Sequence, residues 1–325
     1  MKTIVVPLDG SALAEQILPS VRVLAPLLSA DVHLLHVITE TDRYHLLFDD
    51  PRSEGELEAA LTTRSEIDSG GLAVATAPAA TQTSWEVLRF NAKMYLAEQA
   101  KRLEAAGLRV DFEVEFGFPA EVIAATAARV GASLIAMATH GYSGLRRWAL
   151  GSVADKVLHI SKTPMLLVRG SERMLSPERA LKRILLPLDG SECARQAIPF
   201  ATELAAKTKA ELMLLTVVAP PYLQTPEVMG SYLQYDEAVE SARQRLAYEL
   251  GSYADELHEQ GVAVFPVAVS GLPAEAIVDE AIDRGADLVV MATHGASGLR
   301  RWALGSVADK VLHAINAPLL LVHAQ

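Results

Sequence analysis

The two halves of this 325-residue chain are copies of each other. The segment from Ile4 to Ser20 returns as Ile184 to Phe200, at an offset of 180 residues. The segment from Thr139 to His159 returns as Thr293 to His313, now at an offset of 154, so the first copy carries about 26 extra residues in its middle. A repeat of this length is a whole folding unit, which predicts two tandem domains of one fold.

The domain boundaries follow from these offsets. We expect the first domain at residues 1–170 and the second at residues 181–325, with a polar linker, residues 171–180, between them. The extra residues of the first copy fall at about 39–84, where Ala, Thr, Ser and Gly are abundant. This composition predicts a long mobile excursion rather than part of the core.

Short apolar runs alternate with helical patterns in both copies. These runs are rich in Val, Ile and Leu, as expected for strands that are buried on both faces of a parallel sheet. Five strands with intervening helices predict an open, doubly wound α/β sheet in each copy. In the first copy the runs are TIVVPL, DVHLLHVI, LRVDFEVEF, SLIAMAT and PMLLV, and in the second they are RILLPL, ELMLLTVV, VAVFPVAV, DLVVMAT and PLLLV.

The first helical pattern contains a proline in each copy, Pro19 and Pro199, which we expect to bend the helix. In open α/β sheets, ligands bind beyond the carboxyl ends of the strands, at the point where the strand order reverses. The loops after the first and fourth strands of each copy are therefore the expected binding loops.

Charge and composition narrow the classes of partner. The formal net charge is −11, which opposes sequence-independent binding to nucleic acid or to anionic lipid. No apolar run is long enough for a membrane span, and we expect a cytosolic protein. The single cysteine, Cys193, excludes an internal disulfide framework. The classes of partner that remain are a small ligand and another protein.

The loop after the fourth strand is repeated almost letter for letter. Gly141 and Gly144 allow unusual backbone conformations, and Gly151-Ser152 opens a helix whose free N–H groups and dipole suit a phosphate. Arg146 and Arg147 add positive charge. A plain structural interpretation is also open, in which the serine caps the helix, the glycines turn the chain and the arginines are solvated. Retention of the loop in both copies favours a ligand or an interface, although recent duplication would also produce it.

At these residues the chain resembles the universal stress protein family in its tandem form. The nucleotide-binding branch has a Gly-x2-Gly-x9-Gly-Ser/Thr pattern after the fourth strand, of which the last two glycines and the serine are present in both copies. Alanine replaces the first glycine, as Ala138 and Ala292. The aspartates of the two PLDGS motifs, Asp9 and Asp189, match the position near ribose and adenine, and the second-strand valines match a backbone contact to adenine.

The resemblance implies a Rossmann-like fold of the adenine nucleotide alpha hydrolase type and binding of ATP, which magnesium can accompany. It also implies an intramolecular pseudo-dimer through the last strand of each copy, leaves room for a homodimer, and implies a stress-response role through an unknown protein partner. The implied nucleotide-binding residues are Asp9, Val37, Ala138, Gly141, Gly144, Gly151, Ser152 and Val153 in the first copy, and Asp189, Val217, Ala292, Gly295, Gly298, Gly305, Ser306 and Val307 in the second.

Catalysis and metal binding find little support in the sequence. There is no P-loop of the form GxxxxGK[ST], and no spacing of His, Cys or acidic residues that suits a transition metal. His140 and His294 end strands beside turns, where packing or hydrogen bonding is the commoner role. The leading hypothesis is an ATP-binding sensor or signalling protein. A scaffold without nucleotide and a slow ATPase are the alternatives.

Overall fold

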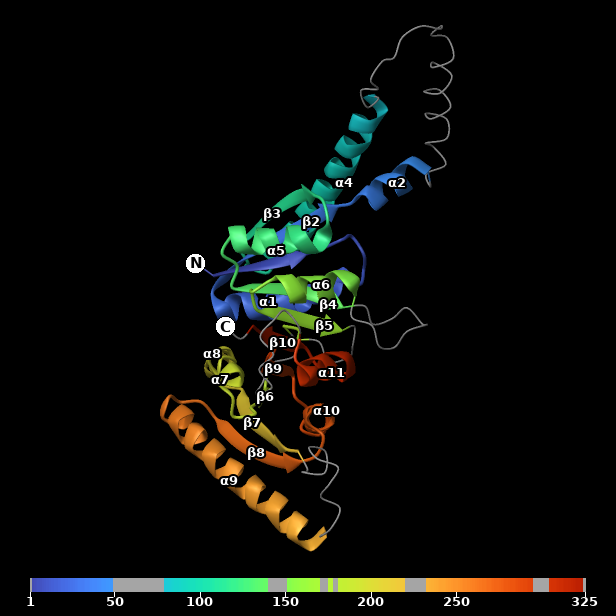
Figure 1. The fold of residues 1–325 in the computed structure, drawn as a ribbon. Coiled ribbons are helices and arrows are strands. Elements are labelled where there is room, and N and C mark those ends of the chain that lie inside the picture. Colours follow the sequence, from blue (N-terminus) through green and yellow to red (C-terminus); the bar gives the residue numbers. More distant parts are fainter. Residues whose placement is uncertain are drawn as a thin grey trace, which may run out of the picture.

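The computed structural model describes residues 2–48, 79–139, 151–169, 175–177, 181–219, 232–294 and 304–323. Within them, ten strands form one continuous sheet in the order β3-β2-β1-β4-β5-β10-β9-β6-β7-β8 (Figure 1). The strands are β1 (Lys2–Pro7), β2 (Ala30–Ile38), β3 (Val110–Phe116), β4 (Leu134–Thr139), β5 (Met165–Arg169), β6 (Arg183–Pro187), β7 (Glu211–Val218), β8 (Val264–Ser270), β9 (Leu288–Ala292) and β10 (Leu319–Val322).

Within each half, the five strands are parallel, which confirms the predicted doubly wound fold. The halves meet through β5 and β10, which pair antiparallel, with Leu320 opposite Leu166. This pairing covers an apolar edge strand of each half, and an uncovered edge of that kind would invite aggregation.

Helices cover both faces of the sheet. They are the 3₁₀ turn η1 (Ala14–Ile17), α1 (Leu18–Leu28), α2 (Glu40–Phe48), α4 (Ala79–Glu104), α5 (Pro119–Arg129), α6 (Ser152–Ile160), α7 (Glu192–Arg195), α8 (Ile198–Thr208), α9 (Tyr232–Glu259), α10 (Pro273–Asp283) and α11 (Ser306–Ala314). The long helices α4 and α9 lie at opposite ends of the molecule (Figure 1). None of the described helices combines the length and apolar character that crossing a bilayer requires.

Two apolar clusters form the core, one on each face. Strand side chains alternate between the faces, so Ile4 and Val6 join one cluster and Val5 joins the other. The first cluster includes residues of α1, α4, α8 and α9, and the second includes residues of α5, α6, α10 and α11. Each cluster draws on both halves of the chain, so the tandem domains share their core across the β5–β10 junction.

The prolines break the first helical pattern more sharply than the bend that the sequence predicts. Pro19 lies in the first turn of α1, after the separate turn η1, and Pro199 takes the same place in α8, after α7. The first turn of a helix tolerates proline because its N–H groups have no partner within the helix. Pro26, inside α1, is accommodated within a continuous helix.

The interval 39–84, predicted as a mobile excursion, is helical at both ends. Residues 40–48 form α2, and α4 begins at Ala79. Alanine has the highest helix propensity, and it begins α4, so this end of the predicted excursion is helical. Residues 49–78 lie outside the described part of the chain.

Candidate functional site at the carboxyl ends of the strands

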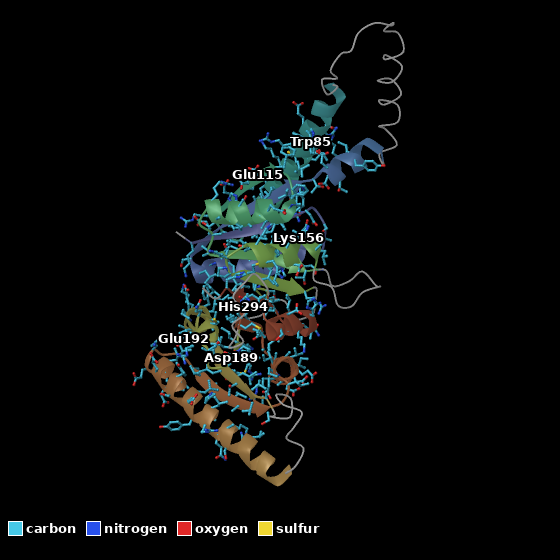
Figure 2. All side chains as sticks on the ribbon, viewed as in Figure 1. Trp85, Glu115, Lys156, Asp189, Glu192 and His294 are labelled. Atoms are coloured by element: carbon cyan, nitrogen blue, oxygen red, sulfur yellow. The ribbon has the colours of Figure 1, made fainter. Side chains whose placement is uncertain are left out.

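The strand order reverses beside β1 in the first half and beside β6 in the second. β1 lies between β2 and β4, and β6 lies between β7 and β9. The carboxyl ends of these strands carry the residues that the sequence nominates: Asp9 after β1, Val37 in β2 and Ala138 in β4, with matching positions in the second half. Figure 2 labels Asp189 and His294, which follow the neighbouring strands β6 and β9. The topology therefore brings the candidates to one edge of each half.

Each aspartate stabilises the turn after the first strand of its half. Asp9 Oδ1 accepts a hydrogen bond from the Ser11 N–H at 2.9 Å, and Asp189 Oδ1 accepts one from the Ser191 N–H at 3.0 Å. In each turn the glycine between the aspartate and the serine has a positive φ, +85° at Gly10, which other residues adopt rarely. Both aspartates are exposed at the carboxyl edge, so the turn positions a carboxylate where a ligand can reach it.

The helices after the fourth strands begin at glycine. Gly151 and Gly305 are the N-caps of α6 and α11, and in neither helix does a side chain cap the first turn. Ser152 and Ser306 occupy the first helical position and are exposed, so the structure rejects the interpretation that these serines serve only as caps. The N–H groups of a first turn have no acceptor within the helix, which makes both helix starts suitable for an anion.

Gly305 is also required by packing. A Cβ added there would lie 3.0 Å from the Thr293 carbonyl oxygen and 3.4 Å from His294 Cα. The Gly305 N–H donates to the same Thr293 oxygen at 2.8 Å. The close approach of α11 to the end of β9 therefore gives this glycine a structural role, in addition to any contact with a ligand.

The remaining candidate residues differ in burial, and some of them lie outside the described residues. Val37 and Val217 are half-buried near the ends of β2 and β7, Ala292 is buried at the end of β9, and Ala138 is half-buried one residue before the end of β4. Val153 and Val307 are half-buried in the first turns of α6 and α11. Gly141, Gly144, Gly295 and Gly298 lie outside the described residues, as does His140.

A polar cluster beside the first site was missed by the sequence analysis. Glu15 Oε1 accepts hydrogen bonds from Tyr95 Oη at 3.1 Å and from Gln99 Nε2 at 3.0 Å. The Tyr95 ring meets the His36 ring edge-on, with centroids 6.2 Å apart. Burial lowers the pKa of His36, while the Leu8 carbonyl and nearby carboxylates, including that of Asp9, act in the opposite direction.

The cluster links the predicted site to α4. Burial, followed by the negative charges of Glu15 and Asp9, raises the pKa of Tyr95, so its hydroxyl remains protonated and continues to donate. Since these residues are about 80 positions apart in sequence, no local pattern points to them. The only available signal was that the two copies differ at these positions.

At the position equivalent to this polar cluster, the second copy has a cationic side chain. Arg195 occupies the position equivalent to Glu15, and its guanidinium lies 5.8 Å from the centroid of the Tyr253 ring, where the first copy has Gln99. Arg195 Nη2 also donates to the Gly190 carbonyl oxygen at 3.2 Å, and Arg195 forms an ion pair with Glu192. The two candidate sites therefore share their turns and helix starts but differ in local charge.

An open cavity of about 960 Å³ adjoins the first site. It lies beyond the ends of β2 and β3, and its walls include Trp85, Phe116 and Phe118. The Trp85 and Phe116 rings meet edge-on with centroids 5.2 Å apart, and the Arg43 guanidinium lies over Trp85. Figure 2 shows Trp85 on α4, at the end of the molecule distant from the second half.

Comparison with known proteins assigns the family. The model of the universal stress protein family matches residues 1–169 and again residues 180–323. The chain belongs to the universal stress protein family. It is a tandem protein with two such domains, as the repeat predicts.

Relatives and solved structures agree with this assignment. A universal stress protein of Methanocaldococcus jannaschii is 34% identical over 146 residues, which are 45% of this universal stress protein and 84% of the relative. One of Mycolicibacterium smegmatis is 27% identical over 233 residues, 69% and 74% of the two chains. The crystal structure of a universal stress protein from Archaeoglobus fulgidus matches with a TM-score of 0.70 at 20% identity, covering 99% of this chain and 98% of that one, and shows the same fold.

The described part of this universal stress protein contains no cluster of metal-ligating side chains. Among the residues that the structure describes, no group of three or more His, Cys, Asp or Glu side chains is placed to hold a metal ion.

Proposed function

We propose that each half of the protein binds one ATP molecule and that the protein uses the bound nucleotide to sense or signal stress in the cytosol. Family membership supports the role in stress response. The observation that carries nucleotide binding is the uncapped helix start, at Gly151 and again at Gly305, next to the reversal of strand order. Two identical anion-accepting helix starts at this edge suit the phosphates of a nucleotide.

The other candidate residues fit the remaining parts of ATP. The Asp9 and Asp189 carboxylates can accept hydrogen bonds from ribose hydroxyls, and the backbone at Val37 and Val217 can meet the adenine edge. The glycines of the repeated loop, Gly141, Gly144, Gly295 and Gly298, complete the phosphate site in this proposal. The alanines Ala138 and Ala292 add little bulk where the family pattern has glycine. Magnesium would be held by the phosphates, since bound Mg²⁺ commonly takes its ligands from a nucleotide.

One feature weakens the attraction for phosphate and favours modest affinity. Asp155 and Asp309 lie in the first turns of α6 and α11, where their negative charge opposes an anion at the helix start. The same loops carry Arg146 and Arg147, and their counterparts in the second copy, which act in the opposite direction.

The proposal includes the arrangement of the two halves. We propose that the β5–β10 pairing makes the tandem chain an intramolecular pseudo-dimer, with domains at residues 1–170 and 181–325 and a linker at 171–180. Strand pairing, a shared core and the ion pair between Lys2 and Glu203 support it. Association of two whole chains would then have to use another surface.

The test is whether the purified protein carries adenine nucleotide. We expect denatured protein to release a compound with adenine absorbance and the mass of ATP or ADP, in up to two copies per chain. Titration calorimetry on folded, nucleotide-free protein should then give saturable heat with ATP and magnesium. Absence of that heat would support the alternative of a scaffold that binds no nucleotide, and multiple turnovers of phosphate release would support the slow ATPase.

A further inference from the structure

A second cavity lies between the two halves, at the amino ends of the strands and away from the candidate nucleotide sites. Its volume is about 370 Å³, and its apolar walls include Leu28 of α1, Leu134 of β4, Phe200 of α8 and Leu320 of β10. Lys2 and Glu203 also line it, and the Lys2 ammonium donates to both carboxylate oxygens of Glu203 at 2.7 Å.

The repeat predicts an equivalent groove on the other side of the junction. At the offsets of 180 and 154 residues, the position of Phe200 corresponds to Ser20, that of Leu134 to Leu288, and that of Leu320 to Leu166. These three counterparts are completely buried; Leu134 and Leu320 of the open groove are also buried, at 3% exposed, so the two grooves differ at Phe200, which is only half-buried. Something therefore covers Ser20 that does not cover its counterpart Phe200.

Leu175, in the described part of the connecting segment, provides this cover. Leu175 is 1% exposed and belongs to the core cluster that covers this whole face of the sheet. Its carbonyl oxygen accepts a hydrogen bond from Ser20 Oγ at 3.5 Å. Leu181, at the end of the segment, is buried in the same cluster. One groove of the pair thus holds a leucine presented by a polar segment, and its twin remains open.

We propose that the open groove is a docking site for a short segment of a partner polypeptide that presents a leucine, in the manner of this chain's residues 170–181. Phe200 fills part of the volume that Ser20 leaves free on the other side, and the remaining 370 Å³ accommodates one such side chain. Burial of a leucine supplies the attraction, because it removes apolar surface from water on both partners. Lys2 and Glu203, at the groove, offer a donor and an acceptor to the backbone of the incoming segment.

The test uses the full-length protein and a fluorescein-labelled peptide with the sequence GSERMLSPERAL, residues 170–181. We expect saturable fluorescence anisotropy, and binding that is weaker by about tenfold or more for a peptide with Leu175→Asp. In the protein, Leu28→Gln should weaken binding similarly, because Leu28 lines the open groove. Thr208→Gln is the matched control, since Thr208 is the counterpart of Leu28 in the repeat and does not line the open groove.

The outcomes separate the possible occupants. If Leu28→Gln disturbs folding, hydrogen exchange of the parent protein replaces the binding measurement on this variant. Slower exchange at residues 24–28 and 199–204 on peptide addition then supports the proposal. Absence of saturation at about 1 mM peptide with folded protein overturns it. Equal weakening by Leu28→Gln and Thr208→Gln also overturns it, since Thr208 does not line the open groove and the loss would then not be specific to that groove. A dimer of the chain that Leu28→Gln dissociates would identify a second copy as the occupant instead.

Discussion

The Arg169 guanidinium at the end of β5 donates a hydrogen bond, 2.7 Å long, from Nη1 to the His313 carbonyl oxygen near the end of α11. This bond crosses from one half of the chain to the other and satisfies a carbonyl group that the helix itself leaves unpaired. The positive charge also lies at the negative end of the helix dipole. The junction between the halves is therefore held by more than the β5–β10 ladder.

Replacing Arg169 by methionine should destabilise the whole chain. The change removes a charge-assisted hydrogen bond and leaves the His313 carbonyl with one partner fewer, at a cost of about 1.5–3 kcal/mol in the free energy of unfolding. Urea denaturation followed by circular dichroism measures it. Arg169→Lys keeps the charge and should recover part of the loss. Identical midpoints for all three proteins would show that the bond contributes nothing to stability.

The stability of the junction should fall in mild acid because of His323. Burial, with smaller contributions from His294 and His159, lowers the pKa of His323 to about 4 from its ordinary value of 6.5. Below pH 6.5 the unfolded chain takes up a proton at this position while the folded chain stays neutral down to about pH 4, so stability is lost as the pH falls through that window. Between pH 7 and pH 5 the loss attributable to His323 is about 2 kcal/mol.

The variant His323→Leu isolates this contribution. It lacks the titrating group, so its free energy of unfolding should change less between pH 7 and pH 5 than that of the parent. His36, whose pKa is also lowered, adds a change in the same direction to both proteins and cancels in the comparison. Equal changes in parent and variant would contradict the assignment to His323.

Ser152→Ala and Ser306→Ala should separate ligand binding from helix stability. Neither serine caps its helix, so the free energy of unfolding should stay within about 0.5 kcal/mol of the parent value. A hydroxyl that donates to phosphate contributes on the order of 1.5–3 kcal/mol, which predicts ATP affinity weaker by about tenfold or more. Thermal denaturation and titration calorimetry test the two parts. Unstable variants with normal ATP affinity would reverse the interpretation.

The double variant Asp9→Asn, Asp189→Asn tests the ribose contact without disturbing the turns. The side-chain oxygen of asparagine can still accept the Ser11 and Ser191 N–H groups, so the loops should keep their shape. ATP and ADP should weaken by a similar factor, because both contain the ribose. Normal affinity combined with loss of single-turnover hydrolysis would instead make an aspartate the catalytic base of an ATPase.

The two candidate sites should differ in their affinity for ATP, and the second site should bind ATP more tightly. Glu15 adds a negative charge beside the first site, whereas Arg195 and Glu192 balance each other beside the second. Glu15→Gln keeps the acceptor oxygen for Tyr95 and Gln99 and should strengthen the weaker of two ATP dissociation constants by about two- to fivefold. Arg195→Gln should weaken the tighter one. A single constant that neither change alters would refute the inequality.

The sequence predicts the framework of this protein well because strands buried on both faces leave a continuous apolar signal, as in the run around Val5. It predicts less where two distant segments meet. The contact of Glu15 with Tyr95 and the burial of Leu175 against Ser20 depend on how helices and the connecting segment cross, and no local pattern encodes either. Gly305 shows a further limit, because a glycine suits both a phosphate and a tight backbone contact, and only the folded structure shows the Thr293 carbonyl beside it.

The outer strands of the ten-stranded sheet have consequences for how the protein behaves in concentrated solution. Among the described residues β3 and β8 are the outermost strands: β3 carries Asp111 and Glu115, with Glu113 paired to Arg129, and β8 has Pro266, which lacks an N–H group. Like charges repel a second β3, and the proline interrupts any ladder that a foreign strand could form with β8. Within the described part of the chain the sheet therefore ends at β3 and at β8, and the folded protein should resist growth into fibrils by strand addition even when it is abundant.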